Sequence, residues 1–98
     1  MSTEDGRGSF DLDAAWDLAA PVSIRPERFG ALLYHFGTRR LSFLKSPVLL
    51  DVLRRLEDTP TARVACAHAG VAAAELPAYR TALATLAASD MIRQRSAS

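Results

Sequence analysis

Two short apolar runs around a glycine-bearing gap constrain this chain more than any other feature. The runs are Ala31–Phe36 and Leu41–Leu44, and Gly37–Arg40 separates them. This pattern is typical of a β-hairpin. Ser46 and Pro47 follow at once, the serine suited to a helix N-cap and the proline to the first helical position. Because these residue types support little catalytic chemistry, the hairpin indicates a binding module that works through its backbone and shape.

A further strand is predicted just before the hairpin. Val22–Ile24 alternates between apolar and polar residues, and both apolar residues are β-branched. We expect Pro26 to end this strand, because proline cannot donate to a strand ladder, and Glu27–Gly30 to form a turn. The earlier segment Phe10–Ala20 has two interpretations, a short capped helical turn or an extended segment that starts at Trp16.

Three helices are predicted after the hairpin. They cover Pro47–Leu56, Pro60–Ala69, and a third segment that begins between Ala72 and Pro77 and ends near Ala88. Thr59 before Pro60 repeats the N-cap signal, and Gly70 is placed to stop the second helix. The first and third helices each carry one apolar stripe. These stripes are Leu49, Val52, Leu53 and Leu56, and Leu76, Tyr79, Leu83 and Leu86.

The order of elements predicts an α+β domain of winged-helix type, with a three-stranded antiparallel sheet followed by three helices. A chain of 98 residues supports one such domain, expected at residues 10–93 between a disordered segment at 1–9 and a frayed segment at 94–98. No apolar run reaches the roughly 18 residues that span a bilayer, and the N-terminus does not resemble a signal peptide. With a single cysteine as well, we expect a cytoplasmic protein that does not bind membranes.

The sequence predicts no catalytic residues and no metal ligands. Cys66 and His68 are close in sequence, but residues two apart on a helix point about 200° away from each other. His35 is the only other histidine, which is too few for a four-ligand zinc site. A buried thiol beside a partly exposed histidine is the simpler interpretation. We therefore expect neither enzyme activity nor a cofactor.

Three cations flank the second hairpin strand, and their role is open at this point. Arg39, Arg40 and Lys45 can protect a sheet edge from aggregation. The same cations can attract an acidic peptide to an edge that accepts another strand.

A winged-helix DNA-binding regulator is the alternative function. A DNA-reading helix needs side chains that recognise base edges, and the third predicted helix offers Arg80 as its one cation. The net charge of +1 also gives little attraction to phosphates, so we do not expect a nucleic-acid partner. A small structural subunit of an enzyme is a further alternative.

Val22–Pro47, with the sequence VSIRPERFGALLYHFGTRRLSFLKSP, closely resembles the peptide chaperones of mycofactocin biosynthesis. Gly70-Val71, Tyr79–Leu83 and Leu86–Ile92 also fit, so the match spans roughly Trp16 to Ile92. These chaperones are recognition elements for ribosomally made, modified peptides. They are similar to the pyrroloquinoline quinone precursor-binding protein.

The resemblance implies a non-enzymatic chaperone that binds the leader of a mycofactocin precursor as an added strand. It also implies delivery of that peptide to a radical S-adenosylmethionine maturase, which holds the iron–sulfur clusters itself. The implied peptide-binding residues are Arg39, Arg40, Leu41, Ser42, Phe43, Leu44 and Lys45 on the third strand, and Tyr79, Arg80, Leu83 and Leu86 on the third helix. For Tyr79 and Leu83 a place in the core is the competing interpretation, which is favoured for Leu83.

Overall fold

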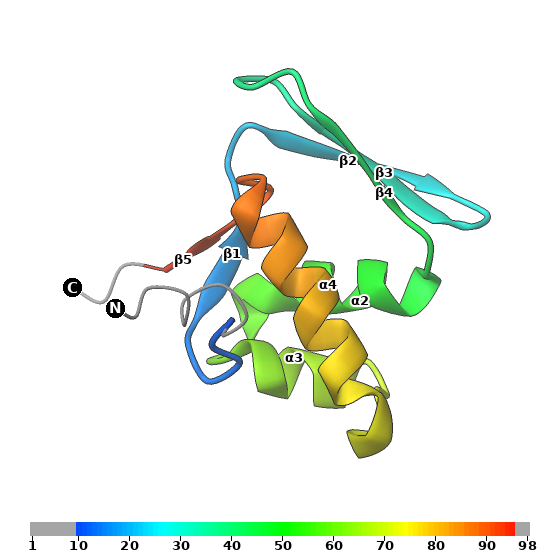
Figure 1. The fold of residues 1–98 in the computed structure, drawn as a ribbon, viewed down its shortest axis with the longest axis vertical. Coiled ribbons are helices and arrows are strands. Elements are labelled where there is room, and N and C mark those ends of the chain that lie inside the picture. The colour runs from blue at the N-terminus through cyan, green and yellow to red at the C-terminus, as the bar shows by residue number, and fades with distance from the viewer. Residues whose placement is uncertain (1–9, 96–98) are drawn as a thin grey trace.

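A computed structural model describes residues 10–95 as two small sheets and three α-helices (Figure 1). The main sheet comprises β2 (Val22–Glu27), β3 (Gly30–His35) and β4 (Leu41–Leu44). The helices are α2 (Pro47–Arg55), α3 (Ala62–His68) and α4 (Leu76–Ala88), with short 3₁₀ segments η1 (Leu56–Asp58) and η2 (Ala73–Glu75). The predicted α+β class is confirmed, and the order of elements is compatible with the winged-helix type. The tail expected at residues 1–9 lies outside the described residues, as do residues 96–98 of the segment expected to be frayed at 94–98.

The main sheet is antiparallel in the order β2-β3-β4. Contrary to the prediction, Pro26 does not end β2 but pairs with Ala31 inside it. The Phe36 N–H donates to the Pro21 carbonyl at 2.9 Å. Because hydrogen-bonded pairs alternate in an antiparallel ladder, the Pro26–Ala31 pair falls at a position that exchanges no hydrogen bonds. The missing N–H of Pro26 therefore costs the ladder nothing, as is usual for proline on an edge strand.

The turn between β3 and β4 is held by side chains as well as backbone. The Nδ1 atom of the buried His35 accepts hydrogen bonds from the N–H groups of Gly37 and Thr38, both at 3.0 Å. Arg39 has a φ of 65°, which places it in the left-handed region. The predicted third strand at residues 39–45 is therefore too long: Arg39 and Arg40 belong to the turn, and Lys45 follows β4.

Gly30 fixes the close approach of β3 to the end of β4. Its φ is +148°, a conformation that residues with a side chain rarely adopt. A Cβ atom added to Gly30 would overlap the carbonyl group of Leu44 and would lie 2.7 Å from the backbone nitrogen of Ser46. Only glycine therefore fits at position 30, which lies against the backbone that leads from β4 into α2.

The predicted start of α2 is confirmed, whereas that of α3 is shifted. Ser46 Oγ accepts a hydrogen bond from the Leu49 N–H at 3.1 Å. The N-cap of α3 is Thr61 instead of Thr59, and its Oγ1 accepts from the Val64 N–H at 3.1 Å. The buried Thr59 donates its hydroxyl to the Arg55 carbonyl at 2.8 Å. Its side chain therefore completes the end of α2 rather than capping α3.

The predicted stop of α3 at Gly70 is confirmed. Gly70 has a φ of +89° and donates its N–H to the Ala67 carbonyl, and Val71 donates to the Cys66 carbonyl. This pair of hydrogen bonds satisfies the last helical carbonyls. The predicted bounds of α4 are also confirmed, and its end repeats the arrangement with Asp90 at a φ of 62°.

A second sheet joins the two ends of the described chain and was not predicted. It pairs β1 (Trp16–Leu18) with β5 (Ile92–Gln94) in antiparallel register. Arg95 donates to both carboxylate oxygens of Asp17, and these hydrogen bonds lower the pKa of the Asp17 carboxyl. Arg95 also donates to the Leu56 carbonyl. Defined contacts thus extend past the expected boundary at residue 93. For Phe10–Ala20, both interpretations hold in part, because a turn precedes the strand at Trp16.

The core lies between the inner face of the main sheet and the helices. Leu33 and Ala31 of β3 and Leu83 of α4 are fully buried within it, as is Val52 of α2. The helices all lie on one side of the sheet, so its opposite, outer face has no helix over it (Figure 1). No helix among residues 10–95 is long and apolar enough to cross a membrane.

Replacing Gly30 by alanine should destabilise the fold far more than the same change at Gly70. Gly30→Ala combines a strained φ with overlap against the Leu44 backbone and should cost about 3 kcal/mol or more. Gly70→Ala introduces only backbone strain, because no atom lies within 4 Å of its added Cβ, and should cost about 1–2 kcal/mol. Urea unfolding measures both losses. An equal loss of unfolding free energy in the two variants would contradict the close approach of β3 to the end of β4.

Candidate functional site

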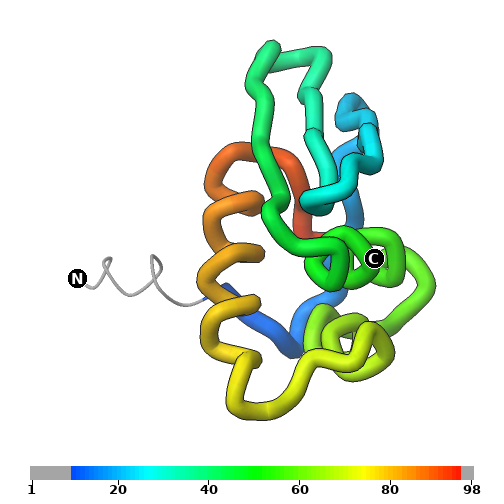
Figure 2. Tube along the Cα trace, turned by 90° about the vertical axis from the view of Figure 1, so that its right-hand side faces the viewer, coloured from blue at the N-terminus to red at the C-terminus, as the bar shows by residue number. Residues whose placement is uncertain are grey.

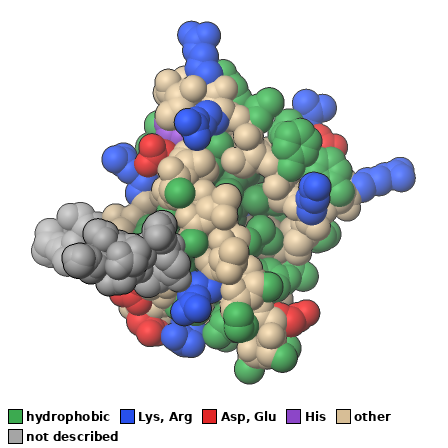
Figure 3. Space-filling view, viewed as in Figure 1, with side chains coloured by type: hydrophobic (Ala, Val, Ile, Leu, Met, Phe, Trp, Pro, Cys, Tyr) green, Lys and Arg blue, Asp and Glu red, His purple; other side chains and the backbone are tan. Residues whose placement is uncertain are grey.

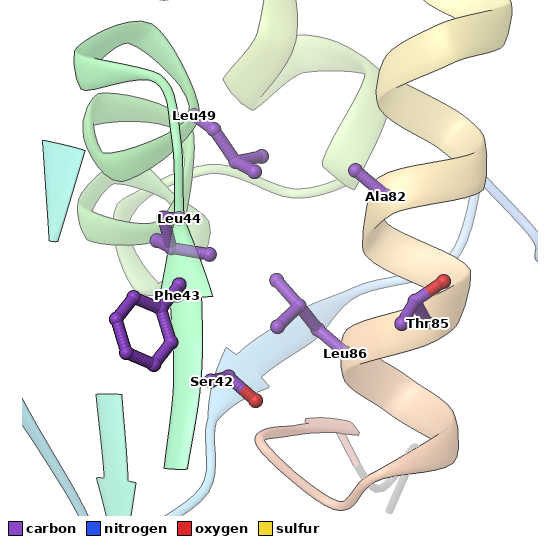
Figure 4. Close-up of a pocket in the computed structure, with 7 residues that line it drawn as sticks. All are labelled: Ser42, Phe43, Leu44, Leu49, Ala82, Thr85 and Leu86. Carbon is purple, nitrogen blue, oxygen red and sulfur yellow. The ribbon is translucent and has the colours of Figure 1, made fainter. Parts of the chain in front are cut away.

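An open groove of about 310 Å³ lies between β4 and α4 (Figure 4). Figure 2 shows the β4 segment (green) running beside α4 (orange). The groove is lined by Ser42, Phe43 and Leu44 of β4, Leu49 of α2, and Ala82, Thr85 and Leu86 of α4. This lining is mostly apolar and carries two hydroxyl groups. Such a surface suits an apolar ligand with few polar contacts.

The groove borders a free strand edge. Within residues 10–95, β4 pairs only with β3. The His35 N–H donates to the Arg40 carbonyl at 3.0 Å. Since hydrogen-bonded pairs alternate, Ser42 and Leu44 are the β4 residues that bond to β3. The backbone N–H and C=O groups of Leu41 and Phe43 therefore point away from β3 and can pair with another strand.

The other edge of the sheet, at β2, is less suited to accept a strand. The same alternation turns the backbone groups of Val22, Ile24 and Pro26 outward from β3. Pro26 has no N–H to offer, and proline is a common device for blocking a sheet edge. β4 contains no proline. Of the two edges of the main sheet, β4 is thus the one able to extend it.

The α4 residues that line the groove lie along the edge of the apolar stripe with which this helix packs on the core. Leu86 points from α4 toward β4, with Ala82 one turn away on the same side (Figure 4). Thr85 is exposed, and its hydroxyl donates to the Thr81 carbonyl at 3.1 Å. Short side chains at positions 82 and 85 leave the space that the groove occupies.

The structure brings together some of the sequence-predicted site residues and separates others. Four of them line the groove: Ser42, Phe43, Leu44 and Leu86. Leu41 is exposed on the outer face of the sheet, and the exposed cations Arg39, Arg40 and Lys45 flank β4. On α4, Arg80 is exposed, Tyr79 packs partly against the core and Leu83 is fully buried, as the core interpretation predicts.

Three further residues that were not predicted from the sequence also line the groove: Leu49, Ala82 and Thr85. Leu49 was assigned to the core stripe of α2, where it is also buried. For Ala82 and Thr85, the available signal was the small size of side chains spaced along α4 next to the apolar stripe. Small residues at such a position allow another chain to approach a helix closely.

The three flanking cations are available to a ligand. The ion pairs found among residues 10–95 involve Arg25, Arg55, Arg63 and Arg95. Arg39, Arg40 and Lys45 form none of them. Their charges therefore act on whatever approaches the β4 edge, at a strength reduced by solvent.

The residues considered for catalysis do not form a site. Cys66 is buried, and burial raises the pKa of its thiol, which disfavours the reactive thiolate. His68 is exposed at the end of α3, and His35 serves the β3–β4 turn. In the part of the chain that the structure describes, no three His, Cys, Asp or Glu side chains could hold a metal ion.

Comparison with known proteins assigns the chain to a family. The sequence model of the peptide chaperone MftB family matches residues 15–93. The chain belongs to this family. A peptide chaperone MftB from Mycobacterium ulcerans (strain Agy99) is 55% identical over 87 residues, which cover 89% of this chain and 80% of that protein. The peptide chaperone MftB of Mycobacterium tuberculosis (strain ATCC 25618 / H37Rv) is 51% identical over 86 residues, 88% of this chain and 79% of that protein.

A third member of the MftB family, from Mycolicibacterium smegmatis (strain ATCC 700084 / mc(2)155), is 50% identical over 84 residues. The alignment covers 86% of this chain and 82% of that protein. No solved structure shows a significant match. Membership in the MftB family confirms the resemblance to the peptide chaperones of mycofactocin biosynthesis. The family is named for peptide chaperones, not for enzymes or DNA-binding regulators.

Proposed function

We propose that this chain binds the leader of a mycofactocin precursor as an additional strand on the free edge of β4. The observation that carries the proposal is the outward direction of the Leu41 and Phe43 backbone groups beside an apolar groove. An added strand gains its main-chain hydrogen bonds from such an edge and its specificity from pockets for alternate side chains. The groove between β4 and α4 supplies those pockets.

The register of the bound leader follows from the spacing of the two offered residues. Leu41 and Phe43 each present one N–H and one C=O, so β4 supports up to four backbone hydrogen bonds to the peptide. Successive side chains of the leader then point to opposite sides of the extended sheet. Those on the inner side enter the groove against Leu86 and Ala82, where apolar residues fit.

The cations around β4 favour an acidic leader. Arg39 and Arg40 lie at one end of the strand and Lys45 at the other. Since these side chains are exposed, each ion pair contributes only about 0–1 kcal/mol, and the main effect is on the association rate. The leader of this proposal therefore carries carboxylates near both ends of its bound segment.

We also propose that the chaperone presents the bound precursor to a radical S-adenosylmethionine maturase in the cytoplasm. Because the family is named for peptide chaperones and not for enzymes, the contribution of this chain to the reaction is positional in this proposal. Holding the leader raises the effective concentration of the reactive end of the peptide near the enzyme.

Replacing Phe43 by proline tests strand addition directly. Phe43→Pro removes the outward N–H but no hydrogen bond to β3, so the sheet should persist. Phe43→Ala is the matched control, because it also removes the ring but keeps the N–H. We expect the proline variant to bind a labelled leader about tenfold more weakly than the alanine variant, since a lost hydrogen bond leaves a peptide carbonyl unpaired. Fluorescence anisotropy measures both affinities, and equal values would refute backbone pairing at Phe43.

Filling the groove tests its role independently of the strand edge. Thr85 lines the groove and Thr81, one turn earlier, does not. Both are exposed on α4, and both hydroxyls donate to the carbonyl four residues before, so the pair is matched. Thr85→Tyr should weaken leader binding at least tenfold, whereas Thr81→Tyr should change it less than twofold. Isothermal titration calorimetry distinguishes the two, and a reversed order would place the leader elsewhere on α4.

A further inference from the structure

The outer face of the main sheet exposes an unusual amount of apolar surface. Five large hydrophobic side chains are exposed within the described residues, and four of them lie on or beside this sheet. They are Phe29, Phe36, Leu41 and Phe43, with exposed fractions of 44%, 61%, 55% and 61%. We call these four residues the outer aromatic face. Contiguous apolar patches of this kind mark interaction sites on soluble proteins.

The outer aromatic face is already ordered by contacts between its own rings. Phe29, in the turn before β3, stacks on Phe43 of β4 with ring centroids 6.2 Å apart. Phe36 meets the ring of Tyr34 edge-on at 5.0 Å. One ring contact therefore lies near each end of β3, on its outer side. A partner would therefore meet a preformed surface and would have few side chains to immobilise.

The charges around this face are predominantly positive. Residues 22–45 contain five Lys or Arg side chains and a single acidic residue, Glu27, although the whole chain has a net charge of only +1. Figure 3 shows Lys and Arg side chains projecting around the upper part of the molecule, where the sheet lies, with hydrophobic side chains between them. A second copy of this chain would set these cations against one another. A partner with carboxylates around an apolar centre would complement both the apolar side chains of this face and the cations around it.

We propose that the outer aromatic face docks the maturase, which meets it with an apolar surface bordered by Asp and Glu side chains. This inference rests on the proposed function, because it assumes that a leader strand extends the sheet beside β4. Every second side chain of that strand would then lie next to Leu41 and Phe43 on the same outer side. The maturase would contact the chaperone and its bound leader as one continuous surface, so the loaded chaperone binds more tightly than the empty one.

The test measures two affinities for each variant: for the labelled leader alone, and for the cognate radical S-adenosylmethionine maturase with and without leader. The double variant Phe29→Ser/Phe36→Ser removes two exposed rings that do not line the peptide groove. We expect at least tenfold weaker maturase binding and a leader affinity within twofold of wild type. Val48→Ser is the matched control, since Val48 is an exposed hydrophobic residue of α2 that belongs neither to the outer aromatic face nor to the groove lining, and it should change neither affinity.

A charge variant tests the acidic border without altering apolar surface. Arg28→Glu reverses an exposed cation beside Phe29 and should weaken maturase binding about tenfold at low salt, with less effect at high salt. Arg54→Glu reverses an exposed cation on α2 and should have little effect. Circular dichroism verifies that each variant remains folded.

The outcomes separate this inference from the proposed function. If wild type fails to bind the leader, strand addition is wrong. In that case, comparing the maturase affinities of wild type and the double variant without leader still tests whether the outer aromatic face binds the maturase. Failure of wild type to bind the maturase, with or without leader, would overturn both this inference and the proposed presentation to the maturase, but not strand addition. Unchanged maturase binding by the phenylalanine double variant would overturn the inference alone. So would concentration-dependent dimers of wild type that the double variant abolishes. Binding to anionic vesicles that depends on the two phenylalanines, with maturase binding unaffected, would assign the face to a membrane instead.

Discussion

The register of the β3–β4 hairpin decides which backbone groups this chain offers to another strand. Gly30 permits the close approach at one end of the hairpin, and the His35 side chain holds the turn at the other. A shift of one residue would exchange the inward and outward groups along β4 and move Leu44 out of the core. Because Leu44 and Leu33 are buried, the hydrophobic core and the hairpin ends enforce the same register. The proposed peptide edge is thus a consequence of how the core packs.

The hairpin, the start of α2 and the stop of α3 could be predicted because each depends on neighbours in sequence. Some predictions failed because the deciding contact joins residues that are far apart in the sequence. Others failed because the sequence pattern allowed two arrangements equally well. Thr59 and Thr61 both suit an N-cap, and the choice depends on whether the Arg55 carbonyl takes the Thr59 hydroxyl. Pro26 stays inside β2 because of its position in the alternating ladder. The β1–β5 sheet joins residues far apart along the chain, so no local pattern indicates it.

The candidate site was predictable on β4 and much less so on α4. Alternation along a strand separates Leu41 and Phe43 from Ser42 and Leu44 without knowledge of the fold. On α4, the apolar stripe at Leu83 and Leu86 identified the side that packs on the core, but the groove lies beside that stripe. Ala82 and Thr85 line it, and their small size can be recognised as the mark of a groove only once the facing strand is known.

The proposed division of labour places the leader at the β4 edge and the maturase on the outer aromatic face. Its central claim is that the leader pairs with the backbone of Leu41 and Phe43. Amide hydrogen exchange measured by NMR, with and without leader, tests this claim most directly. The account predicts that the N–H groups of Leu41 and Phe43 exchange freely in the unbound protein and become protected when the leader binds, whereas those of Ser42 and Leu44 are protected throughout. Saturating leader that leaves the Leu41 and Phe43 amides unprotected would contradict it.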